Sequence, residues 1–92
     1  MTNIVKSNLK TEFSQMEKEL SLGELIREAR NSKGLLLRHV GAELDVDTAI
    51  LSKIERNERR ATREQIIMLA EILNLDKEEL LVKYLTEKIL YQ

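Results

Sequence analysis

The clearest signal of the fold is the run VDTAILSKIERN, residues 46–57. Its Asp47 is suited to cap a helix, because the carboxylate can accept hydrogen bonds from the free backbone N–H groups of the next turn. Its Asn57 tolerates the left-handed conformation in which helices end. The residues between them are therefore predicted to form a short helix with an apolar arc and a polar arc. The apolar arc holds Ile50, Leu51 and Ile54; the polar arc holds Thr48, Ala49, Ser52, Lys53 and Arg56.

The polar arc has small side chains near its start and basic ones toward its end. This distribution suits a helix that enters a groove with anionic walls end-first. Every amphipathic surface helix also has a polar arc, however. The helix alone leaves groove binding and simple solvation as alternatives.

The preceding residues predict a partner helix. Residues 38–44 place Val40 and Leu44 on one inward face, and Gly41 allows a second backbone to approach at mid-helix. Asp45 and Val46 then form the turn into the next helix. Two helices joined by a turn of about three or four residues are typical of a helix-turn-helix.

Three further helices are predicted from N-terminal capping signals and apolar stripes. The signals are Ser21 with Glu24, Thr62 with Gln65, and Asp76 with Glu79; the expected helix ends are Gly34 and Asn74. The core stripes are Leu22, Leu25, Ile26 and Ala29, then Ile66, Leu69, Ala70 and Leu73, then Leu80 and Tyr84.

An N-terminal helical extension is predicted from Leu9, Phe13, Met16 and Leu20, which step by 4, 3 and 4 residues. It is expected to pack on its own domain or on a second subunit. The predicted fold class is all-α, with this extension in residues 1–20 and a compact domain of about five helices in residues 21–92.

Composition limits the function. The 92 residues correspond to one small domain and include no Cys, Pro or Trp, so disulfides and Cys-based metal sites are excluded. No apolar run approaches the roughly 18 residues that span a membrane, and a cytoplasmic location is expected. His39 is the single histidine, and no glycine-rich phosphate loop or acidic metal-ligand cluster is present. We expect no enzymatic activity and no cofactor.

Charge is distributed unevenly along the chain. The formal net charge is -1, but residues 1–26 carry -1, residues 27–63 carry +3 and residues 64–92 carry -3. The densest basic run lies between Arg56 and Arg63. Such a run fits contact with an anionic partner, although a solvated loop has the same composition.

Residues 22–81 resemble the phage repressor and Cro type (XRE) helix-turn-helix family of DNA-binding regulators. The matching features are Arg30 and Gly34, the spacing of Gly41, Val46 and Leu51, the Ile54-Glu55-Arg56 run before a basic loop, and the Leu69-Ala70 and Leu80-Leu81 pairs. The chain length and the final helix further resemble the controller proteins of restriction-modification operons. The resemblance implies a lambda-repressor-like fold.

The resemblance also implies roles for individual residues. Base edges in the major groove are expected to meet Thr48, Ala49, Ser52 and Lys53, and phosphates are expected to meet Arg38, Arg56, Arg59, Arg60 and Arg63. Arg30 and Glu55 are expected to form a structural ion pair. Asp47 has two alternatives, since it can cap the helix or accept from a cytosine amino group. Leu36 and Leu37 replace a usual Ser or Thr and a usual Gln, Asp45 replaces a turn glycine, and Ala61 replaces a common proline.

The final helix has more apolar side chains than one core face needs. Leu81, Leu85 and Ile89 are expected to protrude and to form a self-complementary homodimer interface, unless the N-terminal helix covers them. The predicted function is a homodimeric regulator of a palindromic double-stranded DNA operator, with no small-molecule effector. The alternative is a protein-binding module, antitoxin-like or anti-repressor, that uses Leu36, Leu37 and the outer helices.

Overall fold

The computed structural model describes the backbone of residues 20–90 and the side chains of residues 20–87. These residues form five helices and no strand, so the predicted all-α fold is confirmed. The helices are α2 (Leu22–Ser32), α3 (Leu37–Leu44), α4 (Thr48–Glu55), α5 (Arg63–Ile72) and α6 (Lys77–Leu90). The predicted N-terminal helix lies outside the described residues, apart from Leu20, which packs against the core.

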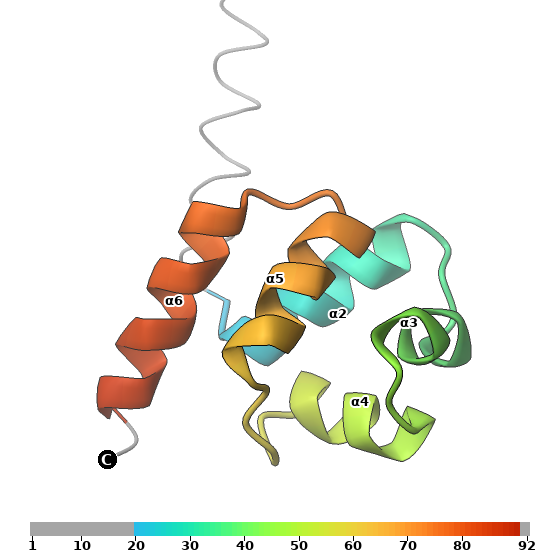
Figure 1. The fold of residues 1–92 in the computed structure, drawn as a ribbon, viewed down its shortest axis with the longest axis horizontal. Coiled ribbons are helices and arrows are strands. Elements are labelled where there is room, and N and C mark those ends of the chain that lie inside the picture. Colours follow the sequence, from blue (N-terminus) through green and yellow to red (C-terminus); the bar gives the residue numbers. More distant parts are fainter. Residues whose placement is uncertain (1–19, 91–92) are drawn as a thin grey trace, which may run out of the picture.

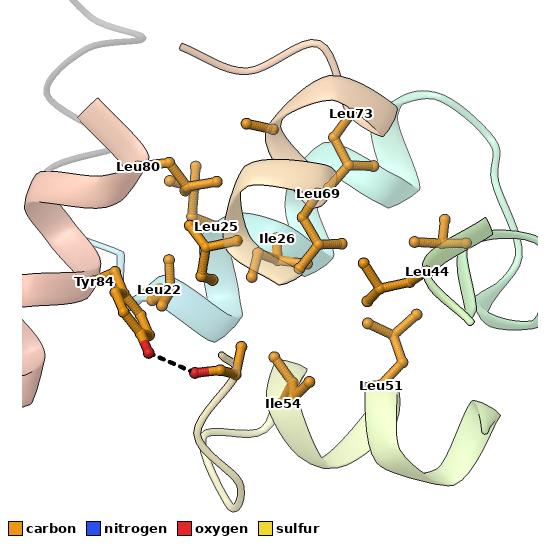
Figure 2. Packing of buried hydrophobic residues seen from close by; sticks show 14 residues of the cluster. Leu22, Leu25, Ile26, Leu44, Leu51, Ile54, Leu69, Leu73, Leu80 and Tyr84 are labelled. Carbon is orange, nitrogen blue, oxygen red and sulfur yellow. Dashed lines mark hydrogen bonds between the residues drawn. The ribbon is translucent and has the colours of Figure 1, made fainter. Parts of the chain in front are cut away.

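The core lies between α2, α5 and the helices on either side of them. Figure 1 shows α6 along one flank, α3 on the other, and α4 across the lower edge. The predicted stripes point inward, and Figure 2 shows side chains from α2, α3, α4, α5 and α6 meeting in one cluster. The largest fully buried side chains are Ile26, Val40, Leu51, Ile66, Leu69, Leu73 and Leu80. Each helix therefore contributes to a single core.

The predicted helix starts are present. The Thr62 hydroxyl accepts from Gln65 N at 3.1 Å, and the Gln65 side chain accepts from Thr62 N at 2.9 Å, which completes a capping box. The Asp76 carboxylate accepts from Glu79 N at 3.0 Å. Before α2 the box is modified: Ser21 Oγ accepts from the backbone N of the third helical residue, but it donates to the Glu24 carboxylate at 2.8 Å.

The helix ends depend on left-handed residues. Asp45, Asn57 and Asn74 have φ of 58°, 60° and 54°, and Gly34 has φ of 68°. The first three are Asp or Asn, whose short polar side chains tolerate this conformation best after glycine. Asp45, which replaces a turn glycine of the resembled family, therefore adopts the left-handed conformation itself.

Candidate nucleic-acid interface

The helix-turn-helix consists of α3, a turn at residues 45–47, and α4. At Gly41 an added Cβ would lie 3.1 Å from Val46 O, so the turn passes closely over the middle of α3. The apolar arc of α4 places Leu51 and Ile54 in the core against α2 and α3. Its opposite face is therefore directed to solvent.

The four predicted base-reading residues share this outward face. Thr48, Ala49 and Lys53 are exposed, and Ser52 is half-buried. In Figure 1, α4 lies along the outer edge of the molecule, and no other described helix covers that edge. The outward face of α4 is thus small, polar and basic, and it is accessible to a partner that has a groove of matching size.

The prediction that the Asp47 side chain caps α4 is wrong. Asp47 occupies the N-cap position with extended backbone angles, but its side chain makes no capping hydrogen bond. The helix begins instead through the Asp47 backbone carbonyl, which accepts from Ile50 N at 3.0 Å and Leu51 N at 3.1 Å. The exposed carboxylate at the leading end of α4 is left unused by the helix.

The predicted phosphate contacts fall into three groups. Arg38, Arg59 and Arg63 are exposed and take no part in a hydrogen bond or ion pair within residues 20–87. Arg56 pairs with the carboxylate of Glu58 at 2.7 Å, and both side chains are exposed. Such a surface pair contributes little and exchanges readily for another anion.

Arg60 differs from the other arginines. Its guanidinium lies over the Tyr84 ring, 3.9 Å from the ring centroid, and its Nη2 donates to Tyr84 O at 3.0 Å. The cation–π contact and the hydrogen bond both direct this side chain toward α6. The sequence analysis grouped Arg60 with the other predicted phosphate contacts, whereas in the structure its side chain is engaged by Tyr84.

The end of α4 is held by a buried ion pair between Arg30 and Glu55. Arg30 Nε donates to Glu55 Oε2 at 2.7 Å and Nη2 donates to Oε1 at 3.0 Å, while Nη1 donates to Leu35 O at 2.8 Å. The two residues are 8% and 5% exposed. The hydrogen bond to Glu55 raises the pKa of Arg30, so the guanidinium stays charged at every accessible pH. The pair fixes α4 to α2 and to the loop before α3.

A second attachment of α4 was missed by the sequence analysis. Asn57 Oδ1 accepts from Gly23 N at 3.1 Å, and Asn57 Nδ2 donates to Ser21 Oγ at 2.8 Å. The only sequence signal was the choice of Asn at a position where glycine would meet the backbone requirement equally well. The side chain of the residue that ends α4 thus also caps the start of α2.

The start of α3 has an unusual cap. Leu36 occupies the N-cap position, and its backbone N donates weakly to His39 Nδ1 at 3.4 Å. His39 is exposed, and its ring nitrogen supplies this contact at a helix start where Leu36, in place of the usual Ser or Thr, makes no side-chain cap. Leu36 is 48% exposed, whereas Leu37 is half-buried and packs against the core.

Within residues 20–87, no three His, Cys, Asp or Glu side chains gather in a way that could hold a metal ion. Nor does the described part of the chain contain a helix long and apolar enough to cross a membrane.

This arrangement of α3, a short turn and an outward-facing α4 defines a DNA-binding helix-turn-helix protein. A family model described as "Helix-turn-helix" matches residues 26–80, more than half of the chain, and the chain belongs to this XRE-type family of transcription regulators. No curated protein matches the chain.

Proposed function

We propose that the protein is a sequence-specific transcriptional regulator that binds a palindromic double-stranded DNA operator as a homodimer. The observation that carries the proposal is the outward face of α4, which joins small polar side chains to Lys53 and is flanked by exposed arginines. In related docking geometries this helix enters the major groove. The expected location is the cytoplasm, on the nucleoid.

The side chains of this face have matching chemistry on DNA bases. Lys53 donates to guanine O6 or N7, and Ser52 donates or accepts. The methyl groups of Thr48 and Ala49 suit a thymine methyl. The unused carboxylate of Asp47 suits a cytosine amino group, which favours the alternative role for that residue.

The exposed arginines are assigned to the phosphates. Arg38 lies at the start of α3, and Arg59 and Arg63 lie beyond the end of α4, so they bracket the base-reading face along the chain. Phosphate contacts orient a protein on the duplex but carry no sequence information. Arg56 joins them after releasing Glu58.

Binding to duplex DNA is expected to weaken steeply with salt. Replacing Arg59 by Ala should reduce the affinity for all sequences and lower the slope of log K against log salt by about 1 per protomer. Fluorescence anisotropy over a salt series measures both quantities. Lys77→Ala is the matched control, because it removes the same charge at the start of α6, at the edge of the molecule opposite α4 (Figure 1).

A salt-insensitive interaction would contradict DNA binding and favour the protein-binding module. The observation that favours this alternative is Leu36, whose apolar side chain is about half exposed next to α3. In that case a protein partner, rather than a duplex, would be sought for the surface around Leu36.

The proposed dimer interface is the outer face of α6. Leu85 is 52% exposed and Val82, which the sequence analysis did not select, is 63% exposed. Leu81 is half-buried against the core, and the side chain of Ile89 lies outside the described residues. On a helical wheel these four positions share an arc of about 100°. A two-fold copy of this arc would bury both apolar surfaces.

Leu85→Glu is expected to convert the dimer to a monomer, because two carboxylates would meet near the symmetry axis without partners. Light scattering should give twice the chain mass for the unmodified protein and one chain mass for the variant. Thr86→Glu adds the same charge one residue further along α6, off the arc, and should leave the dimer intact. A monomeric parent protein would contradict this part of the proposal.

Control of a restriction-modification operon is the narrower proposal. It rests on the resemblance noted from the sequence and on the outer face of the final helix, which is available for pairing. A selected operator that lies upstream of such genes would support it.

A further inference from the structure

The loop between α4 and α5, residues 56–62, carries Arg56 and Arg59 and is attached at both ends to other parts of the fold. At its first end, the Asn57 amide bonds to Ser21 and Gly23 at the start of α2, at 2.8 and 3.1 Å. These bonds fix the point where the chain leaves α4.

The second end is attached to α6 through Tyr84. The Tyr84 hydroxyl donates to Ala61 O at 2.7 Å, the bond drawn as a dashed line in Figure 2. From the loop side, Arg60 covers the Tyr84 ring and donates to Tyr84 O. Tyr84 is buried, and Ala61 is in the core. Three contacts therefore join the consecutive loop residues Arg60 and Ala61 to Tyr84. One is to its hydroxyl, one to its ring and one to its backbone carbonyl.

A third connection links α6 to the start of α2. On α6, one helical turn after Tyr84, the Glu87 carboxylate accepts from Leu22 N at 2.9 and 3.2 Å. The start of α2 is thus bonded both to the loop, through Asn57, and to α6, through Glu87. A pocket open to solvent lies at this junction, lined by residues of α2, the end of α4, the loop and Glu87 of α6.

We propose that Arg60 and Tyr84 are positioning residues for DNA binding. They hold the loop against α6, so that the exposed Arg59 is kept at a fixed place beyond the end of α4, and Arg60 acts through Tyr84 rather than through a phosphate. This inference rests on the proposed function. It makes α6 a support for the DNA-binding loop as well as the proposed dimerisation helix.

The test compares Tyr84→Phe, Arg60→Lys and Arg60→Gln in DNA affinity at fixed salt. Tyr84→Phe keeps the ring and every charge but removes the bond to Ala61, and should weaken binding roughly fivefold, as expected for one lost hydrogen bond. Arg60→Lys keeps the charge but loses the planar fork and much of the stacking. It should weaken binding as much as Arg60→Gln does.

Ile26→Val is the matched stability control. Ile26 is fully buried in α2, and its loss of one methylene should cost about as much folding stability as Tyr84→Phe. If both variants are folded by circular dichroism, only Tyr84→Phe should bind DNA more weakly. Equal affinities of the two variants would overturn the proposal.

Two other outcomes also decide the matter. If Arg60→Lys binds like the unmodified protein while Arg60→Gln does not, the residue is a phosphate contact and the proposal is wrong. If the unmodified protein shows no salt-dependent binding to any duplex, the proposed function itself fails, and the positioning role fails with it.

Discussion

Replacing Glu55 by Ala is expected to lower the free energy of unfolding by about 3–5 kcal/mol, because it leaves the Arg30 guanidinium buried without its carboxylate. Arg30 would keep only the bond to Leu35 O among the three that it makes now. The domain as a whole is expected to have about 5–14 kcal/mol of stability. Urea unfolding followed by circular dichroism should therefore show a large shift of the midpoint.

The chain supplies a matched control for this prediction. Glu58→Ala breaks a second ion pair, Arg56–Glu58, at the same 2.7 Å distance but on the surface, and should cost less than about 1 kcal/mol. Replacing Arg30 by Met together with Glu55→Leu should recover much of the loss, since it removes both charges. Equal costs at Glu55 and Glu58 would show that the buried pair does not hold α4.

Gly23→Ala is expected to destabilise the fold by about 3 kcal/mol, near the upper end for overpacked sites. A Cβ at this position would lie 2.5 Å from both Glu55 O and Ile54 O and 2.7 Å from Asn57 Oδ1. Backbone carbonyls cannot turn aside as a flexible side chain can, so the end of α4 must move away from α2. The gain of about 1 kcal/mol in helix propensity does not compensate.

Gly34→Ala separates this steric effect from the usual cost of losing a glycine. Gly34 has nothing within 4 Å of an added Cβ, but its φ of 68° costs an L-residue about 1–2 kcal/mol. Thermal unfolding of both variants should rank Gly23→Ala as the more damaging. Because Gly23→Ala displaces α4, it should also weaken DNA binding, whereas Gly34→Ala should not. The reverse ranking would contradict the close packing of α2 on α4.

The parts of the fold that were predictable from the sequence depend on local signals. Capping pairs such as Thr62 and Gln65 lie three residues apart, and the apolar stripes repeat every three or four residues, so each helix could be located from its own segment. The left-handed position at Asn57 was likewise predictable from its residue type. The family resemblance added the Arg30–Glu55 pair, which spans 25 residues.

The contacts that could not be predicted join segments far apart in the chain. Glu87 caps α2 across 65 residues, and Asn57 reaches Gly23 across 34. Nothing in the basic run distinguishes Arg60 from Arg59, because the difference comes from Tyr84, 24 residues later. The prediction at Asp47 was wrong although its signal was local. A residue type that is suited to capping can occupy the N-cap position without using its side chain as the cap.

The most direct test of the central claim is selection of bound sequences from a random duplex-DNA pool at low salt, with the unmodified protein and with Lys53→Ala. We expect a motif with two-fold symmetry, its half-sites about one helical turn apart, and a changed base preference in each half-site for Lys53→Ala. Enrichment of no motif, or of the same motif by both proteins, would contradict the claim that α4 reads the DNA sequence through Lys53.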